Sequence, residues 1–393
     1  MTEKSPHVMA GMGRWKVTMR PRSSDEEHRE ATPLELFFDL AFVVAIAQAG
    51  SRLHHSIAAG HVADGILSYG MVFFAIWWAW MNFTWFASAY DPDDVPYRLA
   101  TFVQITGSLI LAAGIPRAFD AQDFSVGTLG YVVMRLALVG QWLRAAHSDR
   151  ARRACAHRYA LGVSVCQLGW IALLYAPQGS MLPGFLTLVV VELLVPVWAE
   201  RACATTWHAG HIAERYGLFT IIVLGESILA ASFAIQATVE TGVLWGELAA
   251  IIIGGLLTVF SMWWLYFDRP MGDLLSSLPR AFFWGYGHFA IFASAAAVGA
   301  GFGVAVDHAT GEVAIGSVGA GAAFAVPVAV YLLGLWALHV KLGTSLPPGA
   351  GLTPLVVLLI LITPWSGEAV LLTGLLAAGL LAIKLVRRHR TDV

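Results

Sequence analysis

Apolar runs of about 20 residues recur along this chain, from residue 33 almost to its last residues. A run of that length is what an α-helix needs to cross the hydrocarbon layer of a membrane. Because no water is available in that layer, a spanning segment has to bond its backbone groups internally, and a helix does so. The pattern therefore predicts an all-α integral membrane protein.

The composition excludes several other classes of protein. Charged residues make up 13% of the 393 residues, whereas soluble domains carry about 25%. The 24 basic and 26 acidic residues leave no net field to attract a polyanion, so we expect no nucleic-acid partner. Three scattered cysteines give no disulfide framework or zinc site, and the sequence has no phosphate-binding loop. We therefore expect no enzyme and no cofactor.

Windows bounded by Gly, Pro and charge clusters predict twelve transmembrane helices. Their ranges are 33–53, 62–88, 97–117, 126–145, 157–176, 181–199, 212–236, 243–267, 281–304, 313–340, 351–364 and 367–386. Residues 1–32 are polar and carry no short apolar core, which predicts a cytoplasmic tail rather than a cleaved signal. Residues 387–393 are predicted to form a second tail.

The basic residues indicate the orientation, because Lys and Arg stay on the cytoplasmic side of a membrane. With twelve helices and the N-terminus inside, all but three of the 24 basic residues fall on the cytoplasmic side. The three are Arg52 and Arg117, which fall outside, and Arg135, which lies within a helix. The sequence thus predicts that both termini are cytoplasmic.

The two halves of the chain share an ordered set of residues. In each half an acid is followed by a glutamine: Gln48 comes nine positions after Asp39, and Gln236 comes ten positions after Glu226. A tryptophan pair, an Asp and a Pro, and a Pro with an Arg then follow in each half; these are Trp77-Trp78, Asp91-Pro92, Pro96 and Arg98, against Trp263-Trp264, Asp268-Arg269-Pro270, Pro279 and Arg280. The period is roughly 185 residues, or six helices. Since six is even, we predict two parallel six-helix repeats, 33–199 and 200–386.

Ionisable residues at membrane depth indicate function, since a charge there costs roughly 2.5–3.5 kcal/mol. Three acids are predicted to lie deep, Asp39, Glu192 and Glu226, while Glu35 lies nearer the inner end. An acid without a basic partner at that depth holds a proton or binds a cation. We predict these four as ion- or proton-binding residues, with Arg135 as a counter-charge or as a clamp for an anionic substrate. A hydrogen bond to a neighbouring helix is the structural alternative for each acid.

A second polar cluster lies at the start of the predicted helix 212–236, at His208, His211, Glu214 and Arg215. Steps of three place the two histidines and the glutamate along one side of a helix. Such histidines suit a metal site, a titrating gate or an ordinary cytoplasmic helix start. We predict no metal ligand and keep the four residues as gate or counter-charge candidates.

Five further residues are predicted to line a cavity or pore. They are Gln48, Trp78, Trp264, Gln236 and His288. The tryptophans have an alternative interpretation as interface anchors, and the lone histidine as a hydrogen-bonded structural residue. His54, His55 and His61, by contrast, are predicted to lie solvated in one short outer loop.

Two segments resemble a known family. The run Thr32-Pro33-Leu-Glu35-Leu-Phe37-Phe38-Asp39 and the run from His211-Ile-Ala-Glu214-Arg215 to Gly225-Glu226-Ser227 are similar to motifs of the bacterial low temperature requirement protein A family. The resemblance implies a multi-pass protein of the bacterial inner membrane. It marks five motif positions, Glu35, Asp39, Glu214, Arg215 and Glu226, and supplies no substrate.

Three functions are compatible with these residues. The leading hypothesis is a proton- or cation-coupled secondary transporter, in which Asp39 and Glu226 face a central cavity. The alternatives are a cation or proton channel and a lipid-interacting or sensory scaffold without transport. Membrane lipids and an unidentified ion or solute are the expected partners. Parallel repeats are compatible with a monomer and with a homodimer.

Overall fold

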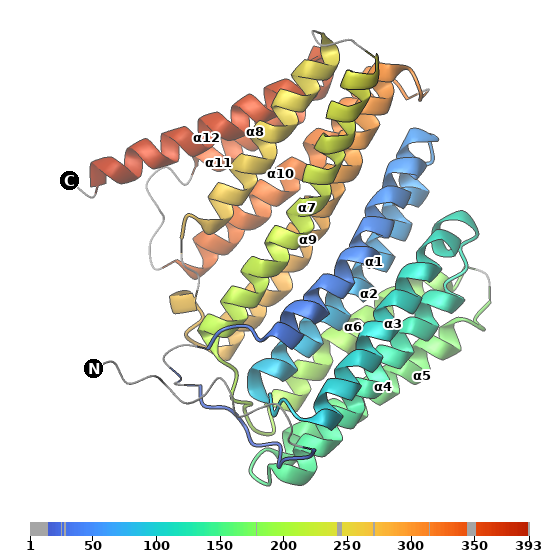
Figure 1. Cartoon of the computed structure of the whole chain (residues 1–393), viewed down its shortest axis with the longest axis vertical. Helices are drawn as coiled ribbons and strands as arrows, with labels where there is room; N and C mark the ends of the chain where they lie inside the picture. Colours follow the sequence, from blue (N-terminus) through green and yellow to red (C-terminus); the bar gives the residue numbers. More distant parts are fainter. Residues whose placement is uncertain are drawn as a thin grey trace. The chain divides into compact units, whose positions relative to one another are not determined.

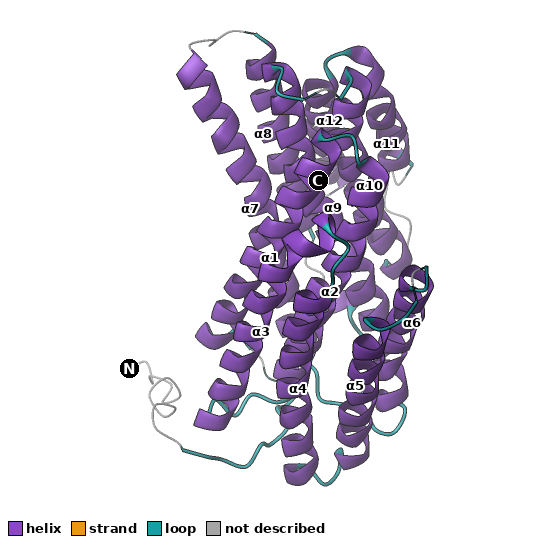
Figure 2. Cartoon of the chain, turned by 90° about the vertical axis from the view of Figure 1, so that its right-hand side faces the viewer, coloured by secondary structure: helices purple, strands orange, loops and turns teal. Residues whose placement is uncertain are grey.

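The computed structural model describes residues 15–24, 26, 29–177, 179–241, 246–269, 272–313, 315–343 and 351–391. Within these residues the chain forms twelve α-helices and two short 3₁₀ helices, without a β-strand (Figure 1, Figure 2). The helices are α1 (Pro33–Ala58), α2 (Val62–Ala89), α3 (Val95–Asp120), α4 (Ser125–Ser148), α5 (Arg153–Leu173), α6 (Met181–Glu200), α7 (Ala209–Thr241), α8 (Glu247–Phe267), η1 (Gly272–Leu274), α9 (Leu278–Thr310), α10 (Ser317–Leu342), α11 (Leu352–Ile362), η2 (Thr363–Ser366) and α12 (Ala369–Thr391). The predicted all-α class is confirmed.

Ten of the described helices are long and apolar enough to cross a membrane, by length and composition. This set is that of a polytopic membrane protein, although the sequence predicted twelve spans. The two remaining helices are α5 and α11. α11 has 11 residues and is about 16 Å long, against roughly 30 Å for a bilayer core. α5 has 21 residues but begins with Arg153, His157 and Arg158, which lower its mean hydropathy.

Several helices continue beyond their predicted ranges. α1 runs to Ala58 rather than 53, and α9 runs from Leu278 to Thr310 rather than from 281 to 304. The predicted ranges followed apolar residues, whereas a helix continues through polar residues until its backbone is capped. α9 ends at Gly311, whose φ of 77° is the left-handed conformation that glycine adopts without strain.

The chain divides into two compact units. Unit 1 comprises Met1–Ala45, Ala75–Ala118 and Asp123–Ile212, and unit 2 comprises Ile46–Phe74, Phe119–Gln122 and Ala213–Val393. α1 and α2 therefore each contribute to both units. The two six-helix repeats stay a prediction. Pro270 of the repeat pattern, and residues 1–14 and 392–393 of the predicted tails, lie outside the described residues.

Unit 1 packs α3 against α4 through glycines. Gly107 of α3 meets Gly130 of α4 so closely that a Cβ atom at Gly130 would overlap the carbonyl oxygen of Gly107 and the backbone nitrogen of Leu111. Small residues of this kind let membrane helices approach until their backbones touch. α4 then packs on α5, and α5 on α6.

Unit 2 is organised around the pairs α9–α10 and α8–α12. A Cβ atom at Gly301 of α9 would overlap the carbonyl oxygen of Ala323 in α10, and one at Gly254 of α8 would overlap the backbone of Val370 and Leu371 in α12. The short α11 contacts both α10 and α12 (Figure 1). The buried side chains of α11 thus pack against longer helices of the same unit.

The close approach of α3 and α4 predicts a difference between two glycines of α4. We expect Gly130→Ala to lower the free energy of unfolding by about 1–3 kcal/mol, because the new methyl group has no room. Gly127→Ala is the matched control, since a Cβ atom there meets nothing within 4 Å, and it should be neutral or stabilising by up to about 1 kcal/mol. Thermal unfolding in detergent measures both. Equal stability of the two variants would contradict this packing.

Candidate functional site

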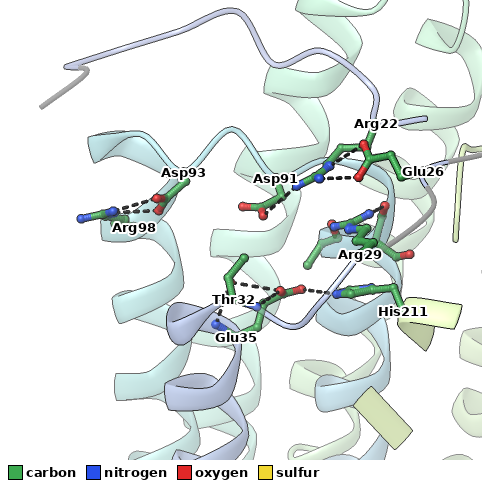
Figure 3. Close-up of polar contacts among 11 residues, drawn as sticks. Arg22, Glu26, Arg29, Thr32, Glu35, Asp91, Asp93, Arg98 and His211 are labelled. Carbon is green, nitrogen blue, oxygen red and sulfur yellow. Dashed lines mark hydrogen bonds and ion pairs between the residues drawn. The ribbon is translucent and has the colours of Figure 1, made fainter. Parts of the chain in front are cut away.

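α1 begins with a capping box formed by Thr32 and Glu35. The Thr32 hydroxyl accepts a hydrogen bond from the Glu35 backbone N–H at 3.3 Å, and a carboxylate oxygen of Glu35 accepts one from the Thr32 backbone N–H at 2.8 Å. Pro33 occupies the first helical position, where its missing N–H costs nothing. The other Glu35 oxygen lies 3.1 Å from Nε2 of the buried His211 (Figure 3). Two predicted site residues therefore meet at the start of α1.

His208 immediately precedes α7 and caps it. Its Nδ1 accepts a hydrogen bond from the backbone N–H of His211 at 3.0 Å. Nε2 therefore carries the proton and donates to the carbonyl oxygen of Glu26 at 2.8 Å. The His208 backbone N–H donates to the Ser88 hydroxyl at 3.0 Å. These contacts correspond to the helix-start interpretation of this cluster.

Two other members of the predicted gate belong to α7 in unit 2. Arg215 is fully buried, whereas Glu214 is exposed. Adjacent residues of a helix point about 100° apart, so one side chain can face the helix packing while the next faces outward.

The segment before α1 brings two arginines to the end of α2. Arg29 donates to the carbonyl oxygens of Ala87 and Ser88, which lack partners within the last turn of the helix. Arg22 Nη1 lies 3.6 Å from Oδ2 of Asp91, just beyond α2 (Figure 3). The segment thus supplies positive charge where the helix end is negative.

Asp91 is an acid poised near neutral pH. Burial, together with the negative charge of Glu35, raises the pKa of Asp91 to about 7, even though Arg29 and Arg22 oppose the rise. The side chain of Asp91 is 4% exposed. In the sequence, Asp91 is notable only as part of the repeat pattern.

Asp94 has the opposite environment. Arg144 of α4 forms an ion pair with it, and the backbone N–H groups of Val17 and Tyr97 donate to it at 2.8 and 3.1 Å. Burial acts against the charge, but these donors outweigh it and lower the pKa of Asp94. Asp94 therefore stays charged and joins the N-terminal segment to α3 and α4.

Glu192 of α6 lies in the polar core of unit 1 and is fully buried. Side chains from α2, α4 and α5 donate hydrogen bonds to its carboxylate. The donors are Trp78 Nε1 at 2.6 Å, Arg135 Nη2 at 2.9 Å, Trp170 Nε1 at 3.0 Å, Tyr131 OH at 3.1 Å and Gln167 Nε2 at 3.3 Å. Both carboxylate oxygens accept hydrogen bonds, so the protein itself supplies the donors and the counter-charge for this acid.

For two residues of this core the structure adds to or differs from the prediction. Trp78, predicted to line a cavity, is buried and donates to Glu192. Arg135, predicted as a counter-charge, has Glu192 as its acid. Nothing in the spacing along the chain indicated which of the deep acids it would meet, because α4 and α6 are separated by a further helix.

Asp39 of α1 is also fully buried in unit 1. Trp80 Nε1 donates to its Oδ1 at 2.7 Å. Trp80 follows Trp78 by two positions, which places the two indoles on nearly opposite faces of α2. One face of α2 therefore donates a hydrogen bond to Glu192, and the opposite face donates one to Asp39.

Unit 2 contains a pocket of about 520 Å³ lined by α1, α7 and α9. Gln48 and His54 of α1, Glu226 of α7 and Asp307 of α9 are among its lining residues. Glu226 is half-buried near the middle of its helix. Within the part of the chain that the structure describes, the Glu226 carboxylate has no hydrogen-bond or ion-pair partner.

His54 and Asp307, which both line this pocket, contact each other. His54 Nε2 lies 2.6 Å from Oδ2 of Asp307, and both side chains are about one quarter exposed. The prediction that His54 is solvated in a loop is wrong, because α1 continues to Ala58 and carries it against α9. The contact joins positions 253 apart, and no sequence signal indicated it.

Besides Trp78, three other residues predicted to line a cavity are not among those that line this pocket. Trp264 of α8 is 47% exposed, and Gln236 of α7 is exposed. His288 is buried; its Nδ1 donates to the carbonyl oxygen of Trp284 at 2.7 Å, and its Nε2 accepts from the hydroxyl of Tyr266 at 3.0 Å. Gln48 does line the pocket.

The buried pair in unit 1 predicts an asymmetric response to substitution. We expect Arg135→Met to lower the free energy of unfolding by about 3–5 kcal/mol, because the substitution removes one partner of a buried ion pair. Adding Glu192→Gln should restore part of that loss. Arg52→Met is the matched control, since Arg52 forms an exposed pair with Asp120 and should cost no more than about 1 kcal/mol. Similar losses for Arg135→Met and Arg52→Met, by thermal unfolding in detergent, would contradict the assignment.

The environment of Asp91 predicts a pH dependence. Because folding raises the pKa of Asp91 to about 7, its contribution to stability is complete below about pH 4 and is lost as the pH rises through 7. We therefore expect the wild type to lose a few degrees of Tm relative to Asp91→Asn between pH 5 and pH 8. Asp64→Asn, at an exposed position, should keep the wild-type profile. A constant Tm difference between wild type and Asp91→Asn would refute the prediction.

Comparison with known proteins gives the family. The family model described as "Bacterial low temperature requirement A protein (LtrA)" matches residues 30–386, nearly the whole chain. "Uncharacterized protein RA0937" of Rhizobium meliloti (strain 1021) is 30% identical over 259 residues, which are 63% of this chain and 60% of the length of that relative. The match to the family model and the ten long apolar helices agree with the resemblance carried by the two motifs. This multi-pass membrane protein belongs to the bacterial low temperature requirement A family.

Proposed function

We propose that this protein is a proton- or cation-coupled secondary transporter, with Glu226 as its principal ion- or proton-binding residue. The observation that carries the proposal is the environment of that carboxylate. It is half-buried on a membrane helix, lines a pocket of about 520 Å³ and has no hydrogen-bond or ion-pair partner among the described residues.

A charge inside a membrane protein has to be compensated. For Glu192 five donors of the protein supply the compensation, one of them the guanidinium of Arg135. For Glu226 no described side chain does so, and the pocket leaves room for a mobile partner. A proton or cation that enters and leaves the pocket is a suitable counter-charge, and exchange of that counter-charge is what coupled transport requires.

Asp39 is the second acid of the proposal, with a different environment. It is fully buried and bonded to Trp80, whereas Glu226 faces open space. The two acids belong to different units. We therefore propose separate roles rather than two equivalent ion sites, with Asp39 as an internal acid and Glu226 as the one that exchanges its partner.

The proposal includes a cellular setting. The excess of Lys and Arg in alternate loops favours cytoplasmic N- and C-termini in the bacterial inner membrane. Membrane lipids are the expected surroundings of the exposed apolar side chains, such as Leu168 and Leu358. Both a monomer and a homodimer are compatible with the proposal.

Ion flux into liposomes tests the proposal. Purified protein is reconstituted with an internal pH dye, and proton and potassium gradients are imposed across the membrane. We expect the wild type to dissipate a gradient faster than empty liposomes, and Glu226→Gln to reduce that excess flux at least tenfold, because the amide neither takes up a proton nor binds a cation strongly.

Glu30→Gln is the matched control, the same substitution at an exposed position before α1, and it should keep the wild-type flux. Wild-type flux in Glu226→Gln would rule out the role of Glu226. Wild-type protein that behaves like empty liposomes would rule out ion conduction alone and would leave transport of a solute that the assay does not contain, or the scaffold. Unitary currents in planar bilayers would favour a channel over a transporter.

A further inference from the structure

We infer that the pocket of unit 2 binds a small organic cation, a protonated amine that carries a short apolar group, with Glu226 as its counter-charge. The inference rests on the proposed function and names the substrate class of the same pocket. It follows from the charge, the size and the lining residues of the pocket, and from the extent of the pocket along α9.

The charge of the pocket favours a cation. Three acids line it, Glu226, Asp307 and Glu312, against a single imidazole, His54. The imidazole is already in contact with Asp307 at 2.6 Å. Neither Lys nor Arg is among the lining residues. An anionic ligand would meet repulsion from Glu226 without a basic group to offset it.

The size of the pocket favours a molecule over a bare ion. Its volume of about 520 Å³ lies in the range of roughly 300–1,000 Å³ typical of small-molecule sites. A metal cation is held instead by several oxygen ligands in close contact, about six to eight for calcium. The described residues contain no group of three or more His, Cys, Asp or Glu side chains that could hold a metal ion.

The wall beside Glu226 suits a cation with an apolar part. Leu229, Ala230 and Phe233 follow it on α7, and Ala300 lies opposite on α9. The amide of Gln48 and the carboxylate of Glu226 are acceptors for the N–H groups of an ammonium head. The alkyl part would then lie along the apolar side chains, and the ring of Phe233 offers a further surface for positive charge.

The pocket extends along α9. Its lining runs along α9 from Ala296 to Thr310, roughly 21 Å. Gly299 lies beside Glu226, where a Cβ atom would come within 3.2 Å of the Glu226 carbonyl oxygen. Gly303 lies beside His54, where a Cβ atom would come within 3.0 Å of the imidazole. The two glycines thus let α7 and α1 approach α9 closely beside the pocket.

Calorimetric titration of the full-length protein in detergent tests the inference, with n-butylammonium chloride as the probe. We expect saturable binding by the wild type and a Kd at least tenfold weaker for Glu226→Gln. 1-Butanol, which has the same chain without the charge, and butyrate, which has the opposite charge, should bind at least tenfold more weakly than butylammonium. Potassium chloride should not compete at equal concentration.

Two further variants make the result specific. Ala230→Leu adds three carbon atoms to the apolar wall near Glu226 without changing the charge of the pocket, and it should weaken butylammonium binding several-fold, while Glu30→Gln should bind as the wild type does. If Ala230→Leu fails to fold, the isosteric Glu226→Gln still decides. Equal binding by wild type and Glu226→Gln, or equal binding of butylammonium and butanol, would overturn the inference.

The test also separates this inference from the proposed function. Proton flux that depends on Glu226, together with no butylammonium binding, would overturn the substrate class alone. Butylammonium binding that depends on Glu226, with no flux of any kind in liposomes, would uphold the site and overturn the transporter.

Discussion

The cost of a carboxylate inside an apolar helix bundle governs the arrangement of this molecule. Each of its three deep acids meets that cost differently. Glu192 has an arginine and four neutral donors, and Asp39 has the indole of Trp80. Glu226 has a pocket. Because a buried acid with its full set of donors is held in place by the protein, only an acid open to a pocket can exchange its partner, and this difference is the basis of the functional proposal.

The same requirement explains the role of α2 in unit 1. An indole N–H is a donor without an acceptor, so a tryptophan can neutralise part of a carboxylate while its ring fills apolar volume. Trp78 and Trp80 do so on nearly opposite faces of one helix, toward α6 and α1. The end of α2 has the same need for donors, because the last carbonyl groups of a helix have no N–H partner within the helix. Arg29 supplies them.

The sequence predicted the helices better than it predicted the partners of the polar residues. Long apolar runs are a local property, and so is the Thr32–Glu35 capping box at the start of α1. The contacts of Arg135 and His54 depend on how whole helices are rotated against one another, which spacing along one chain does not contain. Trp264 shows the same limit, because its exposure follows from the rotation of α8. The helix ends were predicted too short where polar residues continue a helix.

The two family motifs contain residues with different physical roles. Glu35 completes a capping box and contacts His211, so its position follows from the need to begin a membrane helix correctly. Glu226, in the second motif, has no such local duty in the described structure and lies where α7 borders a pocket. A local structural role is a sufficient reason for an acid at position 35. At position 226 the described structure shows no such role, and our proposal gives this carboxylate a counter-charge that comes from outside the protein.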